Sequence, residues 1–452
     1  MPQDLTRRDF LTLLTAAGIT LAHGTSTTDR TYAAEAARLT RACMVHYWDQ
    51  AAGMFRAPIL SAEAVRSDGL HDRGYVFWPS LIALHALIEG EKRHPGQYTA
   101  DIARVFDGLE QYWSPDLQAY TAWVRFPGNV DAYYDDNSWA VIVLVEAALA
   151  CNKAQYLNRA TDIMASYIVK AWDDSGSPGG MRWGSDPSKP NTSDRGTSST
   201  AGSALAAMML ARAGVDTAFH AKWGLKLLEW LATNLTDVDG LVMDALTLRT
   251  PSPSVSGGVV RNEPGVPSFT VRRIKWTYNT GVPMRAWVEH YRLTKDPKSL
   301  AAAVDLAHAA IDRRGALFDQ VVHDPNKRYY WDDTYFVHYL VDGLLQVARE
   351  TGDPALTAGI LAEVRRNVDY ARRYIRDPQD GFYWRNWRLY AIGEAQLDAW
   401  QKLTDQTIPP EFAPSERSQD PKSQTFPIND RPLVKTLLAN ASAARLLWLT
   451  SA

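Results

Sequence analysis

The feature that most constrains the fold of this chain is the way short and long segments alternate between its predicted helices. Apolar residues recur every three or four positions along most of the sequence, whereas strict alternation of apolar and polar residues is rare. The pattern predicts twelve helices and few strands. The helices are Ala33–Trp48, Trp78–Lys92, Gln97–Trp113, Asn137–Cys151, Lys153–Trp172, Ser198–Ala213, Thr217–Asn234, Asn279–Leu293, Pro297–Arg313, Thr334–Arg349, Pro354–Arg373 and Pro432–Leu449.

Short links join the second and third helices and each following pair, while a long segment precedes every even-numbered helix. The long segments are Asp49–Phe77, Ser114–Asp136, Asp173–Thr197, Leu235–Tyr278, Arg314–Asp333 and Tyr374–Arg431. Because short links make antiparallel hairpins, all of the long segments reach the same end of a closed ring. We therefore predict an all-α (α/α)6 toroid with six inner and six outer helices and a site at that end. An open solenoid of helical hairpins is the alternative.

The N-terminus has a different character. Thr6-Arg7-Arg8-Asp9-Phe10-Leu11 precedes the short apolar segment Thr12–Ala22, a pattern typical of a twin-arginine export signal, and small residues for cleavage follow at Ala22-His23-Gly24. A helix with two chance arginines is the alternative. We predict a signal and linker over residues 1–30, a single catalytic domain over 31–452, and a periplasmic or extracellular destination.

Composition excludes several classes of function. The formal net charge is -3, so there is no basic excess for nucleic acid. Outside the signal, no segment is long and apolar enough to cross a membrane, and no phosphate loop or close His/Cys cluster indicates a cofactor or a metal. Cys43 and Cys151 lie in apolar helical patterns and are expected to be buried thiols, although a bond between them stays open. We expect a monomer.

The long segments contain aromatic, carboxylate and amide side chains. Aromatic rings pack on the apolar faces of sugars while polar groups bond to hydroxyls, so this mixture favours an oligo- or polysaccharide site. A single loop tryptophan is as often a packing anchor, and only the coincidence at equivalent positions favours a site. The candidates are Trp78, Tyr133, Tyr134, Trp183, Tyr278, Asn279, Trp331, Asp332, Asp333 and Trp384.

The candidate catalytic groups are Asp135 and Asp136 in the stretch Tyr133-Tyr134-Asp135-Asp136-Asn137-Ser138-Trp139. Retaining glycosidases need two carboxyl groups about 5–5.5 Å apart, which consecutive residues at the start of a helix can supply. The partial positive charge of the helix N-terminus would keep one of them ionised. The simpler alternative is that one aspartate caps the helix.

A second acidic pair, Asp332 and Asp333, precedes another inner helix. It could serve an inverting mechanism, which needs about 6.5–9.5 Å between carboxyls, or it could cap a helix and bind sugar hydroxyls.

Three motifs together resemble glycoside hydrolase family 76, the endo-α-1,6-mannanases, over roughly Trp78 to Leu449. They are the paired aspartates, the Gly-Gly-x-x-Trp turn ending at Trp183, and the segment Thr277-Tyr278-Asn279-Thr280-Gly281. The resemblance implies that Asp135 is the nucleophile and Asp136 the acid/base of a retaining α-mannanase. It also implies that Trp183, Tyr278 and Asn279 lie in the sugar cleft.

The chain departs from that family pattern in three places. Ser198-Ser199 stands where a Lys-Asn pair is usual, Thr280 stands for a Gln, and Trp331-Asp332-Asp333-Thr334 replaces a Lys-Gly type sequence. These positions bear on the glycan recognised more than on the fold.

Two alternatives remain at this point. One is another (α/α)6 enzyme, an unsaturated uronyl hydrolase or a sugar epimerase, with Arg182 and Arg385 available to pair with a uronate. The other is a non-catalytic glycan-binding surface protein.

Overall fold

The computed structural model describes residues 27–57, 74–124, 130–249, 254–256, 259–261, 268–407, 427 and 434–451. The predicted export signal lies outside these residues.

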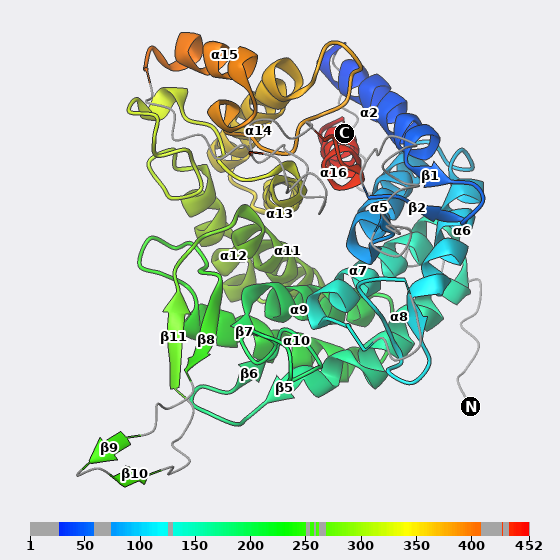
Figure 1. Ribbon diagram of the computed structural model, residues 1–452, viewed down its shortest axis with the longest axis vertical. Coiled ribbons are helices and arrows are strands. Elements are labelled where there is room, and N and C mark those ends of the chain that lie inside the picture. The colour runs from blue at the N-terminus through cyan, green and yellow to red at the C-terminus, as the bar shows by residue number, and fades with distance from the viewer. Residues whose placement is uncertain are drawn as a thin grey trace.

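Six helices form a closed inner ring (Figure 1). They are α5 (Phe77–Arg93), α7 (Tyr134–Cys151), α9 (Thr197–Arg212), α11 (Thr277–Thr294), α13 (Thr334–Glu350) and α16 (Leu437–Thr450). Each of these helices contacts the next in chain order, and α16 also contacts α5. This last contact closes the ring and confirms the toroid over the open solenoid.

Six further helices pack outside the ring, each paired with one inner helix. They are α2 (Thr27–His46), α6 (Thr99–Leu109), α8 (Ala154–Ser166), α10 (Thr217–Asn234), α12 (Pro297–Ile311) and α14 (Pro354–Tyr370). Five of the pairs are consecutive hairpins, whereas the sixth joins α2 to α16 from the other end of the chain. The predicted order of inner and outer helices is therefore confirmed.

Most predicted helix boundaries agree with the structure to within four residues. The exceptions are α2, which begins at Thr27 and not at Ala33, α8, which ends at Ser166 and not at Trp172, and α16, which begins at Leu437 and not at Pro432. A 3-10 turn follows α6 at Glu110–Tyr112 and α8 at Ile168–Ala171, and a π-helical turn extends α14 over Ala371–Ile375. Further 3-10 turns are Pro325–Lys327 and Leu389–Ala391. One short helix, α15 (Glu394–Thr404), lies in the last long segment and was not predicted.

The same antiparallel reversal follows every outer helix. After α2, α6 and α8 it is a two-strand hairpin: β1 (Trp48–Asp49) with β2 (Met54–Phe55), β3 (Trp113–Ser114) with β4 (Ala119–Tyr120), and β5 (Trp172–Asp173) with β6 (Gly180–Met181). After α10, α12 and α14 it is a single bridge, namely Thr236↔Val242, Phe318↔Tyr330 and Arg376↔Tyr383. The long segments thus begin alike, so the chain repeats one unit that consists of a helix pair and an antiparallel reversal.

One sheet stands beside the ring at α9 (Figure 1). Strand β8 (Ala245–Arg249) pairs antiparallel with both β11 (Ser268–Arg272) and β7 (Arg195–Gly196), and a separate hairpin joins β9 (Ser254–Ser256) to β10 (Val259–Arg261). The register brings Leu246 opposite both Arg195 and Val271. The sheet consequently connects the long segments that precede α9 and α11.

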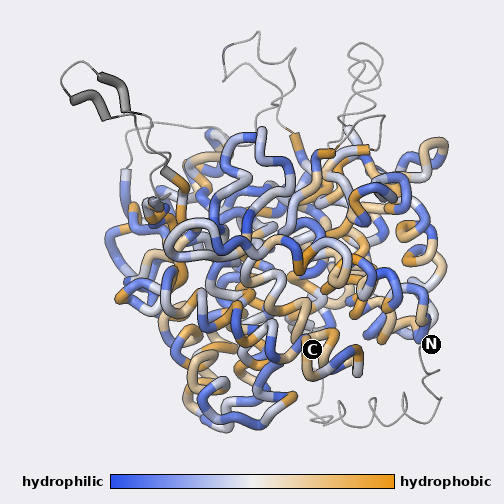
Figure 2. Tube along the Cα trace, turned by 90° about the horizontal axis from the view of Figure 1, so that it is seen from below, coloured by the Kyte–Doolittle hydropathy of each residue, from blue (hydrophilic) through white to orange (hydrophobic). Residues whose placement is uncertain are grey.

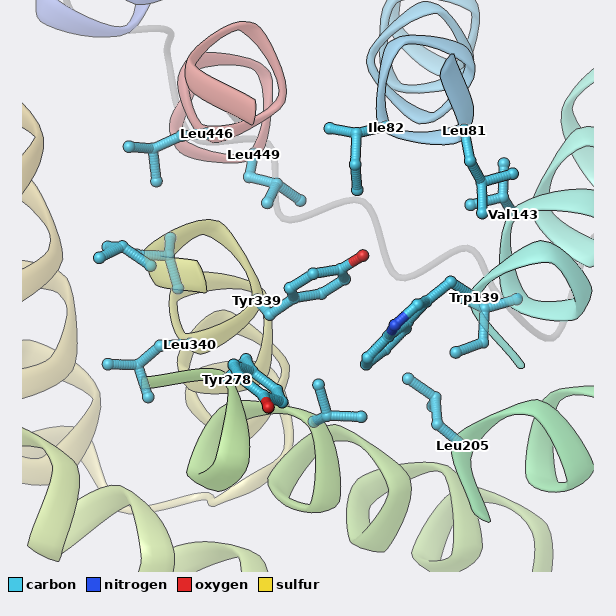
Figure 3. Close-up of a cluster of buried hydrophobic side chains, with 14 of the residues drawn as sticks. Leu81, Ile82, Trp139, Val143, Leu205, Tyr278, Tyr339, Leu340, Leu446 and Leu449 are labelled. Atoms are coloured by element: carbon cyan, nitrogen blue, oxygen red, sulfur yellow. The ribbon is translucent and has the colours of Figure 1, made fainter. Parts of the chain in front are cut away.

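Apolar side chains from the inner helices fill the centre of the ring. Trp139 and Tyr339 stack there with centroids 4.6 Å apart, and Figure 3 shows Leu81, Ile82 and Leu205 converging around them. Figure 2 shows hydrophobic and hydrophilic residues mixed along the trace. The inner helices α5, α7 and α9 are buried on nearly all sides, whereas the outer helices α6 and α8 are buried on one face. The ring interior is therefore a packed core and no open channel.

Two remaining expectations can be compared with the described part of the chain. None of its helices is both long and apolar enough to span a bilayer. Cys43 is buried, Cys151 is partly exposed, and both are free thiols.

Candidate active site

A cavity of about 460 Å³ lies where the inner helices begin, and it collects side chains from several long segments. Asp135 and Asp136 line it. A set of aromatic side chains, called here the aromatic face, comprises Trp78, Trp139, Tyr278, Phe336 and Tyr339. The polar face comprises Asn191, Asp194, Ser198, Asp244 and Arg272. A volume of this size suits a bound sugar unit, with ring faces on one side and hydroxyl partners on the other.

Helix α7 places both aspartates in its first turn. It begins at Tyr134, three residues earlier than predicted, and its N-cap residue is Tyr133, which makes no side-chain cap. The amide of Tyr134 donates to the carbonyl oxygen of Trp183 at 2.9 Å, which satisfies a helix N–H that has no partner within the helix. Neither aspartate therefore stands at the cap position, and both project from the positively polarised end of the helix.

The residues after the pair fix the position of that first turn. The Asn137 amide accepts from the Tyr120 N–H at 2.8 Å and donates to the Tyr120 carbonyl at 2.9 Å, which joins α7 to β4. Ser138 and Ser203 hydroxyls lie 2.9 Å apart and link α7 to α9. The aspartates are thus held between two neighbouring elements.

The two carboxyl groups have unequal partners. Asp135 accepts a hydrogen bond from the Asp136 amide at 2.9 Å through Oδ1 and from the Trp183 indole N–H at 2.8 Å through Oδ2. Ser198 also acts on Asp135, since its hydroxyl lowers the pKa of that carboxyl. Among the described residues, none donates a hydrogen bond to the carboxyl of Asp136. Donors to a carboxylate favour its charged form, so Asp135 is the better stabilised anion of the two.

The pKa values follow the same inequality. Burial raises the pKa of both carboxyls, and for Asp135 its hydrogen bonds act against that rise. Burial together with the negative charges of Asp135 and Asp131 raises the pKa of Asp136 well above its ordinary value. Two carboxylates this close do not both ionise easily, and a proton held by the pair belongs on Asp136.

Trp183 is anchored beside the pair. Its ring packs on Tyr133 with centroids 4.7 Å apart, and residues 133 and 184 form an antiparallel bridge. Asp131, two residues before Tyr133, binds Lys189 at 2.6 Å and the Trp123 indole N–H at 3.0 Å. The predicted cleft residues Tyr133 and Trp183 therefore line the cavity as one cluster.

The polar face was largely missed by sequence reasoning, apart from Ser198, which was noted only as a departure from the family pattern. Arg272 on β11 pairs closely with Asp244 and lies 3.5 Å from Asp194. Asp194 also accepts from the Leu248 amide at 3.3 Å. Burial raises the pKa of both Asp194 and Asp244. Arg272 is the member of this group that lies on a strand, and the available signal was the alternation of apolar and polar residues in β8 and β11.

Six predicted sugar-binding residues are not among the residues that line this cavity: Tyr134, Asn279, Trp331, Asp332, Asp333 and Trp384. Tyr134 is buried and stacks on Tyr167 at 4.6 Å, and Asn279 is fully buried. Trp331 donates its indole N–H to the Ala316 carbonyl at 2.8 Å. The Trp384 ring lies 4.3 Å from the Lys435 ammonium.

The second acidic pair makes contacts outside the cavity. Asp332 Oδ2 accepts from the Thr277 amide at 2.8 Å and from its hydroxyl at 2.9 Å, so it caps the start of the neighbouring helix α11. Asp333 binds the hydroxyl of Tyr335 and lies 4.0 Å from Arg385. Both groups thus organise the end of the ring that carries the cavity.

The described residues contain one group with metal-ligand chemistry, His85, Glu89 and Glu146, whose ligand atoms lie within 4.8 Å of one another. The Lys92 ammonium lies 2.6 Å from Glu146 and 3.2 Å from Glu89. The position of a cation is thus taken by a side chain, and this cluster belongs to the ion pairs inside the ring.

Comparisons with known proteins show the fold and the family of this chain. Meiotically up-regulated gene 191 protein of Schizosaccharomyces pombe is 28% identical over 402 residues, covering 85% of each chain. A family 76 α-mannanase of Bacteroides thetaiotaomicron is 19% identical, with a TM-score of 0.66 over 95% of this chain and 96% of that chain. An inactive α-1,6-mannanase of a Salegentibacter species, with two consecutive aspartates replaced by asparagine and α-1,6-mannotriose bound, is 17% identical, with a TM-score of 0.65 over 93% and 99%. The model of glycosyl hydrolase family 76 matches residues 32–408, and the chain belongs to that family.

Proposed function

We propose that the protein is an exported retaining glycoside hydrolase that cleaves an α-linked, α-1,6-mannan-like glycan. The observation that carries this proposal is the pair of adjacent carboxyls in one cavity with unequal hydrogen-bond partners. Asp135 is the nucleophile, since its donors favour the anion. Asp136 is the general acid and then the general base, since its surroundings favour the protonated form.

The reaction follows in two displacements. Asp135 attacks the anomeric carbon while Asp136 gives its proton to the departing glycosidic oxygen, which leaves a glycosyl ester on Asp135. Asp136 then takes a proton from water, and the water oxygen displaces Asp135 from the anomeric carbon. The configuration is retained after two inversions.

The surroundings of the pair support a neutral sugar. Among the described residues, Arg272 is the only basic one that lines the cavity, and it already faces two carboxylates. The described residues that line the cavity include neither Arg182 nor Arg385, the two arginines considered as partners of a uronate. A relative that binds α-1,6-mannotriose, and whose inactive form lacks two consecutive aspartates, favours a mannan-like substrate.

Export rests on the paired arginines and apolar segment at residues 6–22. We also propose that the exported chain acts as a monomer.

The test is cleavage of a panel of α-linked manno- and gluco-oligosaccharides, followed by a reducing-end assay. We expect the wild type to cleave an α-1,6-mannoside with retention of anomeric configuration, observed by proton NMR of the first product. Asp136→Asn should lower kcat by about 10²–10⁴-fold, the usual contribution of general acid–base catalysis. Asp135→Asn should lower it at least as much, because no nucleophile remains.

The matched control is Asp174→Asn, which changes an exposed aspartate outside the cavity. It should keep full activity. Full activity in Asp135→Asn and Asp136→Asn would refute the assigned roles, and an inverted product would refute the retaining mechanism. Binding of glycans without any turnover would instead favour the non-catalytic alternative.

A further inference from the structure

Asp135 and Asp136 are identical side chains that must hold different protonation states during the reaction. When the pair carries one proton, that proton can be on either carboxyl, and the two arrangements exchange. Only the arrangement with an ionised Asp135 and a protonated Asp136 suits the proposed cleavage. Some feature of the surroundings must therefore distinguish two residues that are neighbours in the chain.

We propose that Trp183 is the positioning residue that directs the shared proton to Asp136, an inference that rests on the proposed function of the pair. Its indole N–H lies 2.8 Å from Asp135 Oδ2. An indole N–H donates and cannot accept, so it stabilises a carboxylate and cannot exchange roles with it. Trp183 thereby acts on the nucleophile as well as contributing an aromatic ring to the cavity.

The indole is held so that its N–H cannot turn away. The backbone of Trp183 accepts from the Tyr134 amide at 2.9 Å, directly before Asp135, and donates to the Thr192 carbonyl at 3.1 Å. At Gly184 a Cβ atom would lie 2.7 Å from the Thr192 side chain, so this close approach needs a glycine. The Tyr133 ring covers the indole at 4.7 Å.

The other donors to Asp135 do not provide this selectivity by themselves. The Asp136 amide belongs to the helix backbone, lies 2.9 Å from Asp135 Oδ1 and involves no atom of residue 183. Ser198 contributes a hydroxyl, which can donate or accept and so can adapt to either protonation state. The indole is the donor-only side chain on this carboxylate.

The titratable groups that face the pair from neighbouring elements do not compete for the proton. Tyr133, Tyr167, Tyr278 and Tyr339 are phenols whose pKa is raised by burial, so they stay neutral near pH 7. Burial would raise the pKa of Asp131, but its hydrogen bonds, with Lys189 first among them, lower it.

The remaining charged groups are those of the polar face. Asp194 and Asp244 have a pKa raised by burial, and Arg272 lies between them. Because none of them contacts Trp183 through a hydrogen bond, a change at position 183 leaves their titration in place. The difference between wild type and variant then reports on the pair alone.

The test is Trp183→Phe, which keeps a six-membered aromatic ring against Tyr133 and removes the N–H together with the rest of the five-membered ring. Loss of a hydrogen bond to a charged acceptor corresponds to a pKa rise of about one unit. The acid limb of the kcat/KM profile should therefore move to higher pH by about one unit. At the optimum, kcat should fall about tenfold, because part of the enzyme now holds the proton on Asp135, while KM should change less than about threefold.

The matched control is Trp172→Phe, which removes an indole N–H that donates to the Asp174 carboxylate at 2.6 Å outside the cavity. It should keep the wild-type profile. If Trp183→Phe changes only KM and leaves both pH limbs in place, Trp183 is a sugar platform and the proposal is wrong. This outcome is distinct from failure of the proposed function, which requires active Asp135→Asn and Asp136→Asn variants. The pH comparison is made on whichever α-glycan the wild type cleaves.

Discussion

The carboxylate of Asp332 does not line the cavity, but it positions a residue that does. It accepts two hydrogen bonds from Thr277, the first residue of α11, and the next residue, Tyr278, belongs to the aromatic face. The first N–H groups of a helix have no partner within it, so an acceptor from the next helix fixes where α11 begins. Asp332 therefore positions Tyr278 through the backbone of α11.

This role predicts a particular pH dependence of stability for Asp332→Asn. Burial raises the pKa of Asp332 to about 7. In the unfolded chain it is near 4, so the stability of the wild type should fall as the pH rises from about 4 to about 7. That decline, on the order of 4 kcal/mol at most, should be absent from Asp332→Asn. Urea unfolding at pH 4, 5.5 and 7 measures it.

Activity separates this role from a catalytic one. When activity is normalised to the concentration of folded protein, the kcat/KM of Asp332→Asn should be no more than a few-fold below that of the wild type. A loss as large as that of Asp135→Asn would instead place Asp332 in the catalytic set, and parallel stability curves would contradict the raised pKa.

Sequence reasoning finds residues whose partners are close in the chain. Asp135 and Asp136 were predicted because their adjacency and the helix start are both visible in one stretch. Arg272 was not predicted, because its partners Asp194 and Asp244 are 78 and 28 residues away and meet it only through the sheet. The donor role of Trp183 toward Asp135 also depends on a contact between two long segments.

At the scale of elements, the backbones of α11 and α13 come into direct contact at Gly281 and Gly343, where any larger side chain would collide with the neighbouring helix. A Cβ atom at Gly343 would lie 2.3 Å from the Gly281 carbonyl oxygen, and one at Gly281 would lie 2.4 Å from the Leu340 Cα atom. Both obstacles are backbone atoms, which cannot rotate aside. The two helices also carry Tyr278, Phe336 and Tyr339 of the aromatic face, so their separation determines its shape.

Gly343→Ala should therefore destabilise the protein even though alanine is the better helix former. Overpacking of this kind costs about 1–3 kcal/mol, and the shift of α13 should also lower kcat/KM. The control is Gly359→Ala on the outer helix α14, where a Cβ atom meets Ile311 at an ordinary 3.7 Å. Gly359→Ala should raise the free energy of unfolding by about 0.5–1 kcal/mol. Thermal unfolding of both variants is the measurement, and equal changes in Tm for the two variants would contradict the close contact between α11 and α13.

The helices were predictable because the 3.6-residue period persists over long segments. The sheet was not, although Leu246 and Leu248 alternate with Thr247, and Phe269 and Val271 alternate with Thr270. Strands of three to five residues contain too few periods of this alternation to be distinguished from the helical pattern around them. Helix α15, an 11-residue helix within the last long segment, was also not predicted.

At the scale of the whole molecule, ion pairs connect the inner helices below the cavity. Arg285 of α11 binds Asp342 of α13 at 2.6 Å and Glu146 of α7 at 2.5 Å. Arg445 of α16 binds Asp342 at 2.5 Å and donates to His338 at 2.7 Å. Together these pairs join four of the inner helices, including the last one, whose contact with α5 closes the ring.

Arg445→Met should consequently weaken ring closure. Arg445 is fully buried, and without it Asp342 keeps only one of its two cationic partners. Removing one member of a buried ion pair costs about 3–5 kcal/mol, because the remaining charge stays desolvated. The control is Arg314→Met, which removes a pair with Asp312 on the exposed surface and should cost less than about 1 kcal/mol.

The pH dependence of the stability lost in Arg445→Met shows whether the lost ion pair with Asp342 is the cause. Burial would raise the pKa of Asp342, but the charges of Arg285 and Arg445 hold it well below its ordinary value. A depressed carboxyl pKa stabilises the fold above the unfolded value near 4, and this stabilisation is lost as the pH falls below it. The deficit of Arg445→Met should therefore be largest at pH 7 and smaller at pH 3, measured by urea unfolding. A deficit that is the same at both pH values would mean that Arg445 acts through packing alone, with its (CH₂)₃ stem filling the centre of the ring.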